Sequence, residues 1–92
     1  MSVTFQLPDG RRVDCHDDVI LIGADAHCHV AVDGCPRPCH ARVSRVAGRW
    51  FIESLGDWLL QVADQPPARK SWLLAGQPIR LSETGPELIF QP

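Results

Sequence analysis

Residues 41–55 of the chain read ARVSRVAGRWFIESL, and they carry its clearest structural signal. The first four alternate between apolar and polar types, as a strand does when one face lies in the core and the other in water. An Ala-Gly pair then interrupts the pattern for two residues, which is the commonest length of a β-hairpin turn. Strand-forming residues resume at 49–55. The stretch therefore predicts two antiparallel strands joined by a tight turn, with Ala41 and Val43 in the core.

Strand-like segments continue on both sides of this hairpin. The apolar run at residues 19–23 indicates a strand that is covered on both faces or that ends in a loop. We expect the remaining strands on either side of the Pro8-Asp9-Gly10 turn and at residues 29–32, 58–62, 72–74, 79–81 and 87–90. No segment carries a sustained helical repeat. About 10–11 short strands at intervals of roughly 8–12 residues predict an all-β fold, an antiparallel sandwich or a barrel.

Length and charge limit the kind of protein this is. Ninety-two residues, 45% of them hydrophobic, predict a single domain over residues 1–92, either complete or part of a longer protein. The net charge is −2 with both signs scattered, which argues against nucleic acid as a partner. The start of the chain has no secretory pattern, and its apolar runs are far shorter than the ~20 residues that span a bilayer. We expect a cytoplasmic protein with no membrane contact through this segment.

All eight cysteines and histidines lie between Cys15 and His40, which raises the hypothesis of a small zinc-binding domain. Two short motifs could each supply half of a zinc site, namely Cys35-Pro-Arg-Pro-Cys39-His40 and Cys15-His16. Residues 27–29 (His-Cys-His) cannot all meet one metal, because neighbours on a strand point to opposite faces. A reducing compartment disfavours a disulfide framework, although a link between Cys35 and Cys39 is a further hypothesis. Buried or loop cysteines, with no metal and no cofactor, are the preferred interpretation.

The same reasoning argues against catalysis. A nucleophilic cysteine needs a histidine within hydrogen-bond reach. Cys39 and His40 are adjacent in the sequence, and on a strand their side chains would point apart. The sequence therefore predicts no enzymatic activity. The tryptophans Trp58 and Trp72 are candidates for partial exposure near the proline-rich loop at residues 65–70, where they could serve as contact hot spots, but core filling is the preferred interpretation.

Several short sequence motifs, taken in order, resemble those of the forkhead-associated (FHA) domain. These motifs are LIGAD at 21–25, CHVAVD at 28–33, CHARV at 39–43, GRWFIESLG at 48–56, LAGQPIRL at 74–81 and LIF at 88–90. FHA domains are eleven-stranded sandwiches that bind phosphothreonine peptides through loops at one end. The resemblance implies the same sandwich here, with a buried Cys28 and with His40 bracing a loop. The residues it places on the binding loops are Gly23, Ala24, Arg37, Pro38, His40, Gly56 and Asp57.

The chain departs from the family at the groups that hold phosphate. Ala24 stands where the family has an arginine, and Arg37 stands where it has a serine. Pro38 replaces a residue that is often basic, and the chain has no asparagine for the peptide-gripping position near residues 59–60. Losing an arginine and a serine contact would cost about 3–5 kcal/mol of binding free energy. Ordinary phosphothreonine recognition is therefore not expected, although Arg37 could offer a planar fork to a phosphate or carboxylate from a new direction.

These observations predict a protein–protein interaction module whose partner is a protein or peptide. An alternative is the FHA-like cytosolic domain of the inner-membrane ring protein of type III secretion systems, which self-associates. That group also lacks the arginine and has a proline-containing loop before the histidine, as in residues 35–40 here. The two hypotheses and the zinc-binding domain remain open on the sequence alone.

Overall fold

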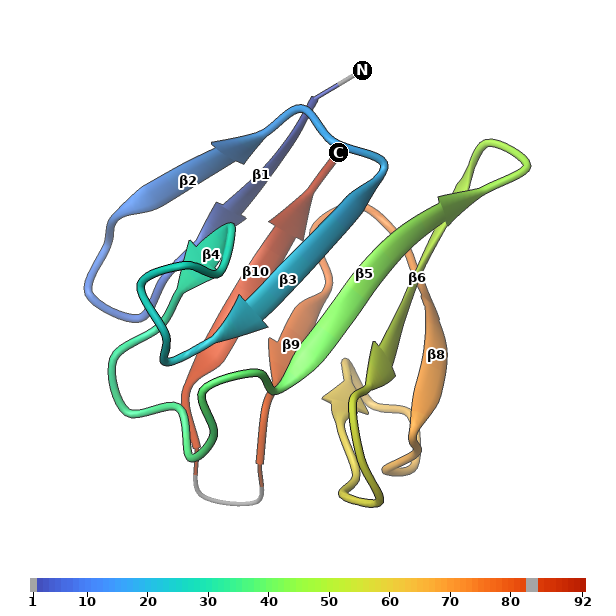
Figure 1. The fold of residues 1–92 in the computed structure, drawn as a ribbon. Coiled ribbons are helices and arrows are strands. Elements are labelled where there is room, and N and C mark those ends of the chain that lie inside the picture. The colour runs from blue at the N-terminus through green and yellow to red at the C-terminus, as the bar shows by residue number, and fades with distance from the viewer. Residues whose placement is uncertain (1, 83–84) are drawn as a thin grey trace.

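The structure is a computed structural model that describes residues 2–82 and 85–92, and it shows two β-sheets packed face to face (Figure 1). The strands in chain order are β1 (Val3–Gln6), β2 (Arg12–Cys15), β3 (Val19–Gly23), β4 (Val30–Ala31), β5 (Ala41–Val46), β6 (Arg49–Ser54), β7 (Gln61–Val62), β8 (Lys70–Leu73), β9 (Pro78–Arg80) and β10 (Glu87–Gln91). All regular structure in the described residues is strand, so the predicted all-β class is confirmed.

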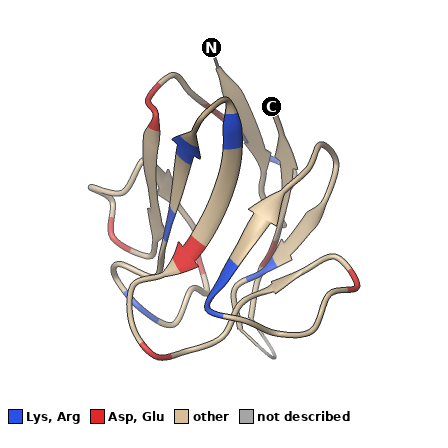
Figure 2. Ribbon diagram, turned by 90° about the vertical axis from the view of Figure 1, so that its right-hand side faces the viewer, with Lys and Arg blue, Asp and Glu red and all other residues tan. Residues whose placement is uncertain are grey.

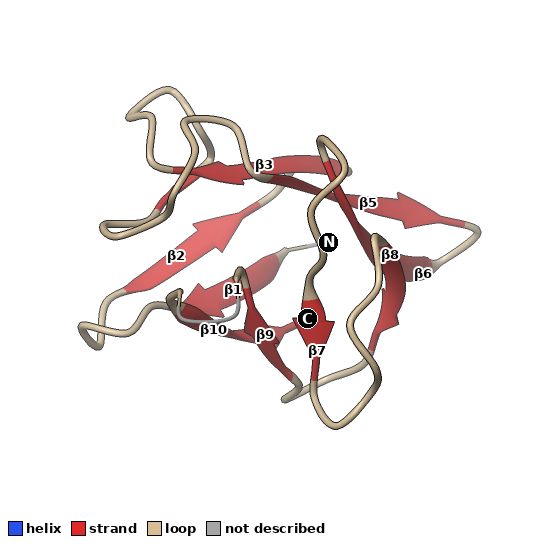
Figure 3. Ribbon diagram, turned by 90° about the horizontal axis from the view of Figure 1, so that it is seen from below, coloured by secondary structure: helices blue, strands red, loops and turns tan. Residues whose placement is uncertain are grey.

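Each sheet has five strands. The first has the order β2-β1-β10-β9-β7 and the second the order β4-β3-β5-β6-β8. Figure 3 shows the two layers from below, with β3 and β5 on one side and β1, β10 and β9 on the other. The sandwich is mostly antiparallel as predicted, but β4 pairs in parallel with β3, at Ile22↔Val30 and Gly23↔Ala31. The chain loops back between these two short strands, and local alternation carries no information about that direction.

The hairpin at residues 41–55 is confirmed. Strands β5 and β6 pair from Ala41↔Ser54 to Val46↔Arg49. The intervening Ala47 and Gly48 both have positive φ angles, 52° and 78°, as a type I′ turn requires. Glycine adopts such angles without strain, whereas alanine does so at a cost.

One apolar core lies between the two sheets. Phe5 of β1 and Phe90 of β10 are fully buried, and their rings lie 5.6 Å apart between centroids. The facing sheet contributes side chains that are equally buried, namely Ile20, Ile22, Val30, Ala41, Val43 and Ile52. Burial of the apolar face of both sheets in one core is what holds the two layers together.

Two predictions about strands need correction. Of the two alternatives for residues 19–23, coverage on both faces is excluded, because Val19 is 48% exposed while Ile20 is fully buried, and the other holds, because β3 ends at Gly23 in the β3–β4 loop. Val19 lies in a cross-strand row on the outer face of the sheet, which continues through Ser44 and Phe51 to Trp72. The strand expected at residues 58–62 is only Gln61–Val62, since the Trp58 indole turns inward to cap the loops.

The connections that matter for function lie at one end of the sandwich. The β3–β4, β4–β5 and β6–β7 connections lie at the lower end in Figure 1, opposite both termini. Acidic and basic residues are intermingled along the strands and loops in Figure 2. In the described part of the chain, no helix is long and apolar enough to cross a membrane.

Candidate functional site

The β3–β4 and β4–β5 loops are held together through their backbones. The N–H of Ala24 donates to the carbonyl of Arg37 at 3.0 Å, and the N–H of Asp25 donates to that of Pro38 at 3.2 Å. Gly23 permits this approach, because a Cβ there would overlap the Pro38 carbonyl oxygen. The structure thus brings together Gly23, Ala24, Arg37 and Pro38, four of the residues singled out from the sequence.

His40 ties these loops to the far sheet. It is fully buried, and its Nε2–H donates to the carbonyl of Leu81, just beyond β9, at 2.5 Å. Its backbone N–H donates to Ile22, and its own carbonyl accepts hydrogen bonds from the N–H of Leu55 and the indole N–H of Trp58. The bracing role implied by the family resemblance is therefore present, although the side chain braces a segment 41 residues away.

The buried imidazole of His40 is neutral at ordinary pH. Burial lowers its pKa below the usual 6.5; the bond to Leu81 opposes this, and the charge of Arg37 lowers it further. With the proton on Nε2, Nδ1 is a buried acceptor that finds no hydrogen-bond partner among the described residues. A protonated His40 would place an extra charge beside Arg37 in a water-poor site.

Trp58 forms the centre of the site. Its indole lies 5.3 Å from the imidazole of His40 between ring centroids, and the guanidinium of Arg37 lies 3.9 Å above its ring. Gly56 allows this position, since a Cβ there would overlap the indole. Asp57 is exposed at the tip of the loop. The result is a layered arrangement of a cation, an indole and an imidazole, with the cation–π contact stabilising Arg37 in place.

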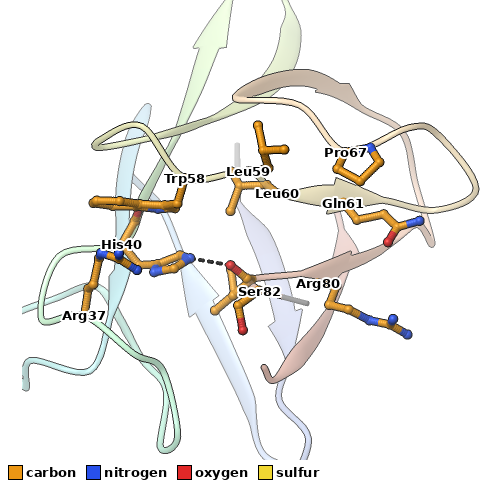
Figure 4. A pocket seen from close by; sticks show the side chains of 10 residues that line it. Arg37, His40, Trp58, Leu59, Leu60, Gln61, Pro67, Arg80 and Ser82 are labelled. Carbon is orange, nitrogen blue, oxygen red and sulfur yellow. Dashed lines mark hydrogen bonds between the residues drawn. The ribbon is translucent and has the colours of Figure 1, made fainter. Parts of the chain in front are cut away.

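A cavity of about 490 Å³ opens beside this arrangement. Figure 4 shows Arg37, His40 and Trp58 on one side and Pro67, Gln61 and Arg80 on the other. The remaining lining residues are Leu59, Leu60, Leu81 and Ser82. The Arg80 guanidinium is also 3.6 Å from the Glu87 carboxylate. The cavity combines an apolar floor with cationic groups at two edges.

Sequence reasoning located part of this site. It named Trp58 as a candidate for partial exposure beside the proline-rich loop but preferred core filling; in the structure Trp58 is half-buried, packs against the core and shares the cavity with Pro67. It missed Gln61, Arg80 and Ser82. These residues lie on β7, on β9 and just beyond β9, and no local motif marks them. Only the pairing of β7 with β9 brings them beside Trp58.

The cysteines and histidines do not form a common cluster. Cys15, Cys28 and Cys35 are buried, Cys39 is exposed, and all four are free thiols. The Cys35 side chain belongs to the core, so the hypothesised link between Cys35 and Cys39 is not formed. In the part of the chain that the structure describes, no three His, Cys, Asp or Glu side chains come together in a group that could hold a metal ion.

The fold matches solved FHA domains. A structure from a study of phosphothreonine-dependent FHA domain interactions is 22% identical, with a TM-score of 0.79 over 100% of this chain and 97% of that one. The FhaA FHA domain, complexed with the intracellular domain of Rv3910, is 23% identical, with a TM-score of 0.78 over 98% of this chain and 100% of that one.

EmbR of Mycobacterium tuberculosis, in complex with a low-affinity phosphopeptide, is 19% identical, with a TM-score of 0.78. The match covers 98% of this chain but only 24% of EmbR. No family model matches the sequence, and no curated protein matches it. The predicted FHA-like sandwich is confirmed, and at these identities the likeness is one of fold.

Proposed function

We propose that the protein is a protein–protein interaction module that binds a peptide segment of its partner in the cavity beside Trp58. The main support for this proposal is the Arg37–Trp58 stack, which lies at the edge of a largely apolar cavity at the loop end of an FHA fold. The FHA domains it resembles in fold support this, since one is complexed with a phosphopeptide and another with a protein domain. The function is binding, not catalysis.

The lining suggests what kind of segment fits. Trp58, Leu59 and Pro67 offer apolar surface that would accept an apolar side chain, whose burial stabilises a complex by roughly 1.5–3 kcal/mol. Arg37 forms no ion pair with any described residue, so its guanidinium fork can meet a carboxylate or phosphate. We therefore expect a peptide with an apolar residue next to an acidic group.

The usual phosphothreonine site is absent from these loops. Ala24 occupies the position of the family's arginine, and its N–H is already bonded to the Arg37 carbonyl in the β4–β5 loop. Arg37 occupies the serine position, and its side chain lies on Trp58 instead of on the Gly23 loop. A ligand would therefore meet Arg37 from the side of Trp58, on the cavity, and threonine phosphorylation would not be required.

Fluorescence polarisation with a peptide library, each threonine sequence present with and without phosphate, tests this proposal. Once a binding peptide is found, Trp58→Ala and Arg37→Ala should each lower its affinity by roughly tenfold or more. The first change removes an apolar wall of the cavity, and the second removes a charge-assisted contact. The matched controls are Trp72→Ala and Arg49→Ala, which remove a similar stack (4.0 Å) on the outer sheet face and should leave affinity unchanged.

Two results would overturn it. One is equal loss of affinity in the control variants. The other is a micromolar phosphothreonine binder whose unphosphorylated form does not bind and which Arg37→Ala abolishes, because that pattern means phosphate recognition. Light scattering over a range of protein concentrations tests the alternative of a self-associating ring protein. A monomer at every concentration would exclude that alternative.

A further inference from the structure

Two cysteines meet where the β3–β4 and β4–β5 loops join. The thiol of Cys28 donates a hydrogen bond to the carbonyl oxygen of Pro38 at 3.2 Å. Cys39 follows on the same planar peptide group, so its Cα lies within roughly 6 Å of the Cys28 sulfur by standard backbone dimensions. Rotation about the Cα–Cβ bond of Cys39 can turn its sulfur toward the sulfur of Cys28.

The backbone already holds the two loops at the required separation. The hydrogen bonds from Ala24 to Arg37 and from Asp25 to Pro38 lie beside the cysteine pair. Gly23 sits between the Pro38 carbonyl and the Cys28 sulfur, which would lie 3.1 Å from a Cβ at that position. A disulfide here needs little backbone movement, and such movement is the usual obstacle to forming one.

Other pairings are excluded by where the side chains lie. Cys35 is buried in the core and its N–H is bonded to Val32, whereas Cys39 is exposed. Cys15 ends β2 in the opposite sheet. Spacing alone favours a link between Cys35 and Cys39, but the fold places Cys39 beside Cys28.

We propose that Cys28 and Cys39 form a reversible disulfide that locks the β3–β4 loop onto the β4–β5 loop. The oxidant is a peroxide. The Cys39 thiolate attacks one peroxide oxygen, the O–O bond breaks, and with hydrogen peroxide a sulfenic acid and water result. The Cys28 sulfur then attacks the sulfenic sulfur, the S–O bond breaks, and a second water leaves. Two thiols are oxidised by two electrons, and one peroxide is reduced to two waters.

The solvent exposure of the two cysteines sets the order in which they react. Cys39 is exposed and meets the oxidant first, whereas Cys28 is 8% exposed and can react only with a sulfur delivered to it. Burial and the neighbouring Cys39 thiol both raise the pKa of Cys28, which keeps it protonated until then. Arg37 and His40 lie within two residues of Cys39 in the sequence and line the cavity, so oxidation would also fix one wall of the cavity. That last consequence rests on the proposed function; the disulfide itself does not.

Peptide mapping of the whole chain tests the disulfide. The folded protein is treated with hydrogen peroxide, alkylated and cleaved before aspartate residues, which separates Cys28 (residues 25–32) from Cys35 and Cys39 (residues 33–56). We expect a cross-link between these two peptides, with the loss of two hydrogen atoms, and fragmentation should place it on Cys39. Dithiothreitol should reverse it, and Cys39→Ser should abolish it without unfolding the protein.

A link within residues 33–56, a dimer joined by disulfides, or over-oxidation of Cys39 with Cys28 still reduced would each overturn the proposal. Circular dichroism of Cys39→Ser confirms that its fold is intact. Peptide binding under reducing conditions is measured separately. If the cross-link forms but no library peptide binds, the disulfide is upheld and the proposed function is contradicted. If a peptide binds but no cross-link forms, the proposed function is upheld and the disulfide is contradicted.

Discussion

At the scale of single residues, three side chains determine the site. Arg37 supplies a charge, Trp58 a flat apolar surface, and His40 the support beneath them. The tryptophan can lie flat only because Gly56 has no side chain, and the loop beside it closes only because Gly23 has none. Contacts in this protein thus explain why glycine stands at these two positions, both of which the family resemblance places on the binding loops.

Acid should weaken the fold through His40. Its pKa is lowered in the folded state, so below the usual value of 6.5 the unfolded chain binds the proton more readily. The free energy of unfolding should therefore fall as the pH drops, by up to about 1.4 kcal/mol per pH unit, until the folded-state pKa is reached. Urea unfolding between about pH 7 and pH 5 measures this slope.

The variant His40→Gln provides the control, because its amide can still donate toward Leu81 but does not titrate. Its stability should change less with pH over the same interval. The lowered pKa values of Asp9 and Asp25 affect stability only at more acid pH, near their ordinary value of 3.8. An equal pH slope in His40→Gln and in the unchanged protein would contradict the assignment.

At the scale of elements, the hairpin of β5 and β6 was predictable because all of its information is local. Alternation, a two-residue break and a second run of strand formers suffice to define it. Strand β4 and the shortened β7 were not predictable in the same way. Strand β4 depends on its parallel partner β3. Strand β7 is short because the Trp58 indole leaves the strand pattern and caps the loops.

The hairpin turn can be improved. Ala47 has a positive φ of 52°, which asparagine tolerates better than alanine in a type I′ turn. Ala47→Asn should raise the free energy of unfolding by about 0.5–1 kcal/mol, as measured by urea unfolding. Ala75→Asn is the matched control, because Ala75 also precedes a glycine but lacks a positive φ. Equal stabilisation by both changes would refute the turn assignment.

At the scale of the whole molecule, both sheets depend on one core. Phe5 and Phe90 of one sheet face Ile52 and Trp50 of the other, and the Trp50 and Phe90 rings are 6.2 Å apart between centroids. Neither sheet buries its apolar face without the other. The domain should therefore unfold in a single cooperative step.

Urea unfolding followed by far-ultraviolet circular dichroism and by tryptophan fluorescence should give the same midpoint. Circular dichroism reports the strands of both sheets, while the buried Trp50 reports the interface between them. Two separate midpoints would show that one sheet persists without the other, which the shared core does not allow.

The sequence by itself determined the class of fold, and it predicts that the usual phosphothreonine-binding groups are absent. Strand alternation and turn residues are local properties, and a chain without asparagine cannot supply one. Only the tertiary structure decided that Trp58 is central, that Arg80 and Ser82 share its cavity, and that Cys39 lies beside Cys28 and not Cys35. The physical reason is that these contacts join loops from both sheets, and their partners are set by strand pairing and shared burial across the whole chain.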